Sequence, residues 1–270
     1  MQDKSRLVGL LTDFGLRDQY VGVMKAVMES VCGGVRIIDI THDVDSQNVA
    51  QGAYLLWASY RHFPAGAVIV AVVDPGVGGS RGIIGVKTNK YTFLAPDNGL
   101  LDLVLWEEEV TEATTIRIEK AATRAILPRT IPPTFHGRDI FAPLAAHLVK
   151  GTRLESLGPK TRVNCVQSPF LEKTSPETKA KVLHVDRFGD VVTNIRSDVP
   201  GVRSRLLTLS VGKRHVQTWA ENYESIALGK ASLIVGSSGL VEIVMNRRSA
   251  ASYLGLKQTD ALHLEYKEQR

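Results

Sequence analysis

The chain lacks the features that mark secreted, membrane-bound and disulfide-stabilised proteins. It has 2 cysteines among 270 residues, Cys32 and Cys165, and they do not have the spacing of metal ligands. Its longest apolar runs are the length of a strand, much shorter than a membrane span. No apolar segment follows the first few residues, so we expect no signal peptide. These absences predict a cytoplasmic protein with free thiols and no membrane partner.

Signatures of phosphate binding, zinc proteases and nucleic-acid binding are missing as well. There is no Gly-x-Gly-x-x-Gly turn after the first predicted strand, no Walker A lysine in residues 76–82 and no His-Glu-x-x-His pair. A bound nucleoside would therefore not be held by its phosphates through a standard loop. The formal net charge is +5, but the basic residues are scattered and form no known nucleic-acid module. We therefore expect no nucleic-acid partner.

The first half of the chain does contain a regular alternation of predicted strands and helices. Helical spacing is seen over residues 20–31, again from Ser46, which we expect to cap the second helix, to Trp57, and from about Arg138. The strand-like runs are residues 7–11, 35–40, 67–73, 83–86 and 91–94. The opening β-α-β-α-β series predicts a parallel sheet with right-handed crossovers.

The second half has a different pattern. From about Cys165 to Thr178 the composition shifts to Gln, Ser, Pro, Glu, Lys and Thr, which is typical of a linker. Short strands separated by turn residues follow, and they predict a small barrel or sandwich. These strands are residues 181–185, 191–195, 206–211, 232–235, 241–244 and 261–266. The sequence thus predicts an α/β N-terminal domain with a mainly parallel sheet (1–165), a linker (166–178) and a smaller β-barrel-like C-terminal domain (179–270).

The most informative segment is the glycine-rich turn Asp74-Pro75-Gly76-Val77-Gly78-Gly79-Ser80-Arg81, which follows the third predicted strand. Proline fixes one backbone angle, and the glycines allow backbone shapes that other residues resist. Such a turn can hold Asp74 and Arg81 side by side at the edge of the sheet. In open α/β sheets, ligands bind at the carboxyl ends of the strands.

Acids also follow the first two predicted strands, as Asp13 and as Asp43 in Thr41-His42-Asp43. A lone Asp at such a position is usually a turn former or a helix cap. In a parallel sheet, however, these acids and Asp74 share one edge, and like charges placed together cost energy unless something compensates them. A carboxylate after the first strand can accept two hydrogen bonds from a ribose diol. Asp13 is therefore a candidate nucleoside ligand.

The segment Phe135-His136-Gly137-Arg138-Asp139 carries a candidate general base. Imidazole titrates near neutral pH, although His136 can equally serve only to cap or pack. We expect Arg138 and Asp139 to form a structural ion pair. A metal site is the rival use of these groups, but their spacing matches no known zinc motif. Its ligands would be His42, Asp43, Asp74, His136 and Asp139.

Seven segments, in order along the chain, carry a family resemblance. They are Leu11-Thr-Asp-Phe-Gly15, Asp39-Ile-Thr-His-Asp43, Val73-Asp-Pro-Gly-Val-Gly78 with Arg81, Ala95-Pro-Asp-Asn-Gly99, Phe135-His-Gly-Arg-Asp-Ile-Phe-Ala-Pro143, Asp186-Arg-Phe-Gly189 with Thr193-Asn194, and Ser237-Ser-Gly239. Each alone is a weak signal, but the ordered set is specific. It resembles the S-adenosyl-L-methionine (SAM) hydroxide adenosyltransferase family, the SAM hydrolases, which are relatives of fluorinase and chlorinase.

The resemblance implies a homotrimer of two-domain subunits, with SAM between the N-terminal domain of one subunit and the C-terminal domain of its neighbour. The implied reaction joins water to SAM and gives adenosine and L-methionine, with SAM as substrate and no cofactor or metal. By similarity, Asp74, Arg81 and His136 handle the water. The substrate-binding residues implied in the same way are Asp13, Phe135, Asp186, Asp190, Ser237, Ser238, Asn246 and Arg247.

Within that set, Asp13 would hold the ribose diol, and Asp186 and Ser237 the ammonium and carboxylate of the methionine part. Asp190 and the backbone near residues 246–248 would meet the adenine. Many relatives carry Asn where this chain has Asp190. A carboxylate can accept from the adenine amino group, but it cannot donate to a ring nitrogen.

The chain also departs from fluorinase, which has Tyr in place of His136, Ser in place of Gly137 and Trp where Gln47 aligns. These differences remove the halide site and favour water.

In one version of the chemistry, His136 takes the proton from the water, while Arg81 holds the water oxygen and lowers the pKa of His136. In the other version, Arg81 and Asp74 handle the proton and His136 orients the water. A SAM or adenosine sensor, a metal-dependent hydrolase and a halide-using relative are the alternative functions.

Overall fold

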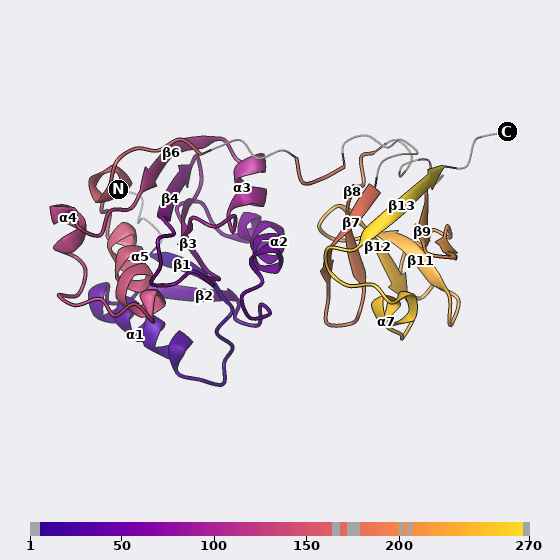
Figure 1. The fold of residues 1–270 in the computed structure, drawn as a ribbon, viewed down its shortest axis with the longest axis horizontal. Helices are drawn as coiled ribbons and strands as arrows, with labels where there is room; N and C mark the ends of the chain where they lie inside the picture. The colour runs from indigo at the N-terminus through magenta and orange to yellow at the C-terminus, as the bar shows by residue number, and fades with distance from the viewer. Residues whose placement is uncertain are drawn as a thin grey trace. The chain divides into compact units, whose positions relative to one another are not determined.

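A computed structural model describes residues 6–163, 168–171, 179–199, 202, 204 and 207–266. Contacts divide the chain into two compact units, Met1–Val166 and Gln167–Arg270 (Figure 1). Cys165, the first five residues and most of the expected linker at 166–178 lie outside the described residues, so the domain boundaries stay predictions. In the part of the chain that is described, no helix has both the length and the apolar character needed to cross a bilayer.

The first unit is built on a six-stranded sheet with the order β2-β1-β3-β5-β4-β6. β1 pairs in parallel with both β2 and β3, and β3 pairs in parallel with β5, whereas β4 runs antiparallel to both of its neighbours. The strands are β1 (Leu7–Thr12), β2 (Arg36–Thr41), β3 (Val68–Val72), β4 (Ile83–Thr88), β5 (Thr92–Pro96) and β6 (Val110–Thr115). The expected mainly parallel α/β sheet is confirmed.

Helices cover both faces of this sheet (Figure 1). α1 and α5 pack on each other and on the face that Val8 and Leu10 of β1 present, where Met24, Phe141 and Leu144 are fully buried. α2 and α3 pack together on the other side. The helices are α1 (Tyr20–Val31), α2 (Val49–Ser59), α3 (Asp102–Glu107), α4 (Ala121–Arg124) and α5 (Ala142–Val149), with single turns η1 (Tyr60–His62), η2 (Gly137–Phe141) and η3 (Leu154–Leu157).

Two expected helix starts are corrected by the structure. Ser46 does not cap α2; Asn48 does, with its side chain accepting a hydrogen bond from the backbone N–H of Gln51 at 3.0 Å. The helix expected from Arg138 begins instead as the π-helical turn η2, and regular α-helix starts only at Ala142. Such turns are frequent at functional sites, because the extra residue in the turn changes where its side chains point. α3 and β6 were not expected from the sequence.

The second unit is a seven-stranded antiparallel sheet with the order β10-β9-β13-β7-β8-β12-β11. A bridge between Trp219, just after β10, and Leu233 in β11 brings the two edges together, so the sheet is a near-closed barrel. Its strands are β7 (Lys179–Val185), β8 (Val191–Arg196), β9 (Leu207–Val211), β10 (Arg214–Val216), β11 (Ala231–Val235), β12 (Leu240–Met245) and β13 (Ala261–Tyr266). The expected barrel is confirmed, while β10 and the short helix α7 (Ala250–Leu254) are additions.

Candidate active site

Asp13, Asp43 and Asp74 lie at one edge of the first unit's sheet, as the sequence predicts. Each follows the carboxyl end of one of three adjacent parallel strands, β1, β2 and β3. The charge of Asp74 is compensated by Arg81, whose Nε donates to Asp74 Oδ1 at 2.9 Å and whose Nη2 donates to Oδ2. Only 4% of the Asp74 side chain and 12% of the Arg81 side chain is exposed, so this two-point ion pair is almost entirely shielded from water.

The glycine-rich loop that carries Arg81 is held from two sides. Asn98, in the Ala95–Gly99 motif, donates from its side chain to the carbonyl of Val73 at 2.9 Å, directly before Asp74. Gly78 has a φ of +76°, and a Cβ added to it would lie 2.4 Å from the carbonyl oxygen of Pro133. Only glycine allows both this backbone angle and this approach. The close approach brings the Arg81 loop against the segment that leads into His136.

His136 completes a chain of contacts through Arg81, whose Nη2 lies 2.8 Å from His136 Nδ1. A guanidinium can only donate, so Nδ1 is the acceptor and the ring proton is on Nε2. Burial lowers the pKa of His136 below its ordinary 6.5, the positive charge of Arg81 lowers it further, and the carboxylates of Asp74 and Asp139 offset only part of this. His136 is therefore neutral at pH 7, as the sequence analysis expects.

Aromatic rings pack around this turn. Phe135 makes edge-on contacts with Phe14 and Tyr20, at centroid distances of 5.8 Å and 5.1 Å. A Cβ on Gly137 would lie 3.0 Å from the Phe135 ring and 3.1 Å from Met24 Sδ, so a larger residue there would have to displace its neighbours. The expected Arg138–Asp139 ion pair is confirmed, with Arg138 Nε donating to Asp139 Oδ1 at 2.7 Å.

The other groups at this edge of the sheet also have specific partners. Asp13 Oδ2 accepts from the backbone N–H of Gln47 at 2.8 Å. His42 is buried, with Nδ1 lying 2.8 Å from Thr12 Oγ1 and Nε2 lying 3.1 Å from Asp39 Oδ1. The rival metal site would need these histidines and acids to converge. Within the described residues, no three His, Cys, Asp or Glu side chains are arranged to hold a metal ion.

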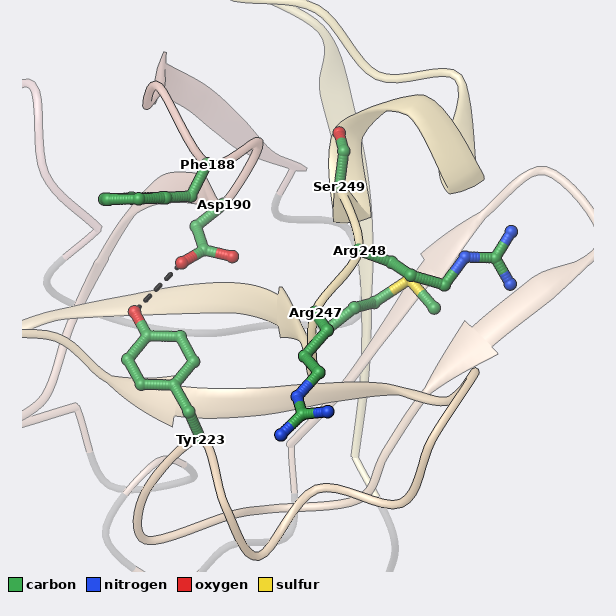
Figure 2. A pocket seen from close by; sticks show the side chains of 7 residues that line it. Phe188, Asp190, Tyr223, Arg247, Arg248 and Ser249 are labelled. Atoms are coloured by element: carbon green, nitrogen blue, oxygen red, sulfur yellow. Dashed lines mark hydrogen bonds between the residues drawn. The ribbon is translucent and has the colours of Figure 1, made fainter.

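The second unit contains a cavity of about 570 Å³ (Figure 2). This volume lies in the range of small-molecule sites. The lining side chains are Phe188, Asp190, Tyr223, Met245, Arg247, Arg248 and Ser249. Phe188 is 77% exposed and offers an aromatic face, whereas Asp190 is only 4% exposed. Arg247 has a φ of +56°, an uncommon conformation for a residue with a side chain.

Asp186 organises the turn that carries Phe188 and Asp190. Its Oδ1 accepts from the backbone N–H of Phe188 at 2.9 Å and from that of Asp190 at 2.8 Å. Gly189 within the turn has a φ of +84°, and an added Cβ would lie 2.8 Å from Ser249 Cα. The turn therefore packs closely on the segment before α7, and this contact fixes one wall of the cavity.

Glu242 in β12 forms an acidic cluster with the turn, and the sequence analysis did not single it out. Burial, together with repulsion from Asp190 and Asp186, raises the pKa of Glu242 to about 7. Its carboxylate lies against Gly236, at the start of the turn that holds the predicted Ser237 and Ser238. The sequence signal was there, since Glu242 is an acid within the otherwise apolar run Leu-Val-Glu-Ile-Val-Met. Asp190 is buried, Asp186 and Glu242 are partly buried, and a cluster of this kind attracts positive charge.

Profiles of known families cover both units. The SAM hydroxide adenosyltransferase N-terminal domain matches residues 8–158, and the C-terminal domain of the same family matches residues 180–263. The chain belongs to this family.

Individual relatives agree with this assignment. The chain is 37% identical to an (R)-S-adenosyl-L-methionine hydrolase of Thermus thermophilus, over 94% of this chain and 97% of that protein. It is 28% identical to a fluorinase of Actinopolyspora mzabensis, over 71% of this chain and 72% of the other. A crystal structure of an uncharacterized conserved protein from Thermotoga maritima superposes with a TM-score of 0.85, at 36% identity over 95% of this chain and 99% of that one.

In this SAM hydroxide adenosyltransferase family member, the predicted site residues fall into two sets, one in each unit. Asp13, Asp74, Arg81, Phe135 and His136 gather in the first unit, and Asp186, Asp190, Ser237, Ser238, Asn246 and Arg247 lie in the second. Asn246 does not line the cavity; its side chain donates to the carbonyl of Ile226 at 3.1 Å. The individual roles that the resemblance implies stay predictions.

A substitution at Gly78 tests whether its close approach to Pro133 positions Arg81. Replacing Gly78 with Ala should push the Arg81 loop away from Pro133, lower the free energy of unfolding by about 1–3 kcal/mol and weaken the Arg81–His136 contact. We expect the measured SAM turnover to fall at least tenfold. Gly22→Ala in α1 is the matched control, because an added methyl there meets nothing within 4 Å. Full turnover by Gly78→Ala would show that this approach does not position Arg81.

Proposed function

We propose that this protein hydrolyses SAM to adenosine and L-methionine by attack of water at C5′. The observation that carries the proposal is the chain of contacts in which one guanidinium joins the Asp74 carboxylate to the neutral His136 ring. A binding protein has no need for such a chain, whereas an enzyme that activates water does. Since the Thermus thermophilus relative is named for the (R) form of SAM, we extend that form to this chain.

In the proposed reaction, water takes its place between Arg81 and His136. A nucleophilic water needs a donor to stabilise charge that develops on its oxygen and an acceptor for its proton. Arg81 Nη2 and His136 Nδ1 are such a pair, and they now contact each other at 2.8 Å. Separating them by one water lets Arg81 donate to the oxygen while His136 accepts the proton. The C5′–oxygen bond forms, the C5′–sulfur bond breaks, and methionine leaves as a neutral thioether.

Proton transfer must accompany attack rather than precede it. Forming free hydroxide from water at pH 7 costs about 12 kcal/mol, because the pKa of water is ~15.7. A neutral imidazole that takes the proton as the new bond forms avoids much of this cost. The lowered pKa of His136 supports the proposal, since it keeps the ring unprotonated at neutral pH.

The second version of the chemistry keeps the Arg81–His136 contact closed. His136 would then donate from Nε2 to the water and only orient it, while Asp74 and Arg81 handle the proton. This version fits the tautomer that the contact with Arg81 imposes. The two versions differ in whether His136 must be basic, and a substitution below separates them.

We propose that Asp13 accepts from the ribose hydroxyls, with the aromatic cluster at Phe135 beside the reacting carbon. In the second unit, the planar adenine suits the cavity with its aromatic face and buried acceptor. Asp186, Glu242 and the Ser237–Ser238 turn suit the charged methionine part and the sulfonium. The homotrimer that the resemblance implies stays a prediction.

The direct test is incubation of chelator-treated protein with SAM in H₂¹⁸O, followed by mass spectrometry. We expect methionine and adenosine that carries ¹⁸O at the 5′ oxygen, because water itself attacks C5′. Unchanged SAM would indicate a sensor, and turnover that returns only with divalent cations would indicate a metal-dependent hydrolase. A 5′-chloro product formed in added chloride would indicate a halide-using relative.

His136→Gln separates the two versions of the chemistry, because glutamine can hold a water by hydrogen bonds but cannot take its proton. If His136 is the base, kcat should fall by about 10²–10⁴ while the Kd for SAM stays within threefold. His147→Gln in α5 is the matched control, and its kcat should equal that of the wild type. Retention of more than about a tenth of the wild-type kcat in His136→Gln would assign His136 to orienting water.

The pKa of Glu242 near 7 predicts a pH dependence of substrate binding. Ionised Glu242 attracts the cationic substrate, and protonation as the pH falls through 7 removes that charge. Between pH 8 and pH 6, the Kd for SAM should rise by up to about tenfold. If His136→Gln is inactive, calorimetry in that background measures the Kd without turnover; if it is active, the pH dependence of KM is measured instead. Glu242→Gln should weaken SAM binding and make the Kd independent of pH, whereas the control Glu224→Gln should keep the pH dependence of the wild type. If the Kd of Glu242→Gln still depends on pH, another group causes the dependence.

A further inference from the structure

Tyr223 lines the cavity of the second unit, and the proposed function assigns it no role. It lies in the long segment between β10 and β11, and its ring lines the cavity. Its hydroxyl donates to Asp190 Oδ2 at 2.9 Å, as Figure 2 shows. Asp190 is 4% exposed, so this contact engages one oxygen of a carboxylate that is nearly inaccessible to water.

The segment that carries Tyr223 is anchored on both sides of the ring. Asn222 accepts from the backbone N–H of Ser225 at 3.0 Å, which forms a local turn. Ile226 is buried against Ile234 and Val244, and its carbonyl accepts from the side chain of Asn246 at 3.1 Å. Tyr223 is thus held in position by contacts within the protein. The same contacts give Asn246 a structural role, whereas the resemblance implied that it binds substrate.

Tyr223 also controls the charge of Asp190. Burial raises the pKa of Asp190, the hydrogen bond from Tyr223 opposes that rise, and the neighbouring Asp186 adds to it. Burial and the contact with Asp190 raise the pKa of Tyr223 well above its ordinary value, so its hydroxyl stays protonated and donates. In Figure 2 the other oxygen of Asp190 points away from Tyr223, toward the middle of the lining side chains. Tyr223 therefore presents Asp190 to the cavity as an oriented group that only accepts hydrogen bonds.

Resting on the function proposed above, we infer that Tyr223 is a positioning residue that makes the site select a 6-amino purine over a 6-oxo purine. An ionised carboxylate accepts from the 6-amino group of adenine. A 6-oxo purine presents a carbonyl oxygen at that place, and two buried acceptors facing each other are left unsatisfied. A protonated Asp190 would donate to that carbonyl and lose the selectivity. Tyr223 prevents this by stabilising the ionised form.

The test is calorimetric binding of adenosine and inosine to the wild type and to Tyr223→Phe between pH 5.5 and pH 8. The variant keeps the ring and removes only the hydroxyl. At pH 7 we expect adenosine to bind about five- to tenfold more weakly, and the ratio of the inosine Kd to the adenosine Kd to fall at least threefold. The pH at which this ratio falls should move upward, because Asp190 then protonates more easily. For SAM, KM should rise while kcat stays near the wild-type value.

Two further variants isolate the path through Asp190. Tyr253→Phe makes the same change in α7, outside the cavity lining, and should leave both Kd values unchanged. Asp190→Asn should itself lower the selectivity, and adding Tyr223→Phe to it should lower the selectivity no further, because the partner of the hydroxyl no longer ionises. Thermal melting confirms that each variant is folded.

Each outcome bears on one proposal or the other. An unchanged selectivity and pH profile in Tyr223→Phe, in a protein that cleaves SAM, would overturn the inference and leave the hydrolase proposal standing. A wild type that prefers adenosine through Tyr223 but leaves SAM intact would overturn the hydrolase proposal alone. Failure of the wild type to prefer adenosine over inosine would overturn the inference, whatever the turnover.

Discussion

The guanidinium of Arg81 makes the contacts on which the arrangement of Asp74 and His136 depends. It neutralises Asp74, which is almost fully buried, and it holds the ring of His136 in one tautomer with a lowered pKa. Removing one partner of a buried ion pair strands the other charge, at a cost of about 3–5 kcal/mol. The glycine-rich loop, the Asn98 side chain and the close approach at Gly78 all serve to place this one group.

The second unit contains an acidic cluster, of which Asp190 lines the cavity together with Arg247 and Arg248. Burial, together with repulsion from Asp190 and Asp186, raises the pKa of Glu242. Burial and repulsion from Asp186 raise the pKa of Asp190, and the hydrogen bond from Tyr223 opposes that rise. Repulsion within an acidic cluster costs free energy, and a cationic ligand relieves it. In the proposed function, these acids favour the sulfonium and ammonium of SAM over neutral compounds.

The sequence predicted what depends on local pattern and on chain order. The apolar strands, α1 and the turn from Asp74 to Arg81 could be recognised because spacing and glycine content determine them. The cap of α2 could not be recognised from local sequence. Asn48 follows Gln47, which has a left-handed backbone conformation, and the backbone N–H of Gln47 donates to Asp13, 34 positions away in the sequence. Tyr223 was missed for the same reason: it contacts Asp190 across 33 positions of sequence, and pairing of β12 with both β8 and β11 places the starts of β8 and β11 at the same end of the sheet.

Pairing of Arg81 with Asp74 also resolves a conflict that the proposed chemistry creates. An arginine is the strongest donor available to an oxygen that develops negative charge, yet its positive charge would repel a sulfonium substrate. The Asp74 carboxylate makes the pair neutral overall while leaving guanidinium N–H groups directed at His136. In the proposed reaction, the neutral pair stabilises the attacking oxygen without repelling the cation that is attacked. The proposal therefore gives Asp74 a role that does not require it to touch the water.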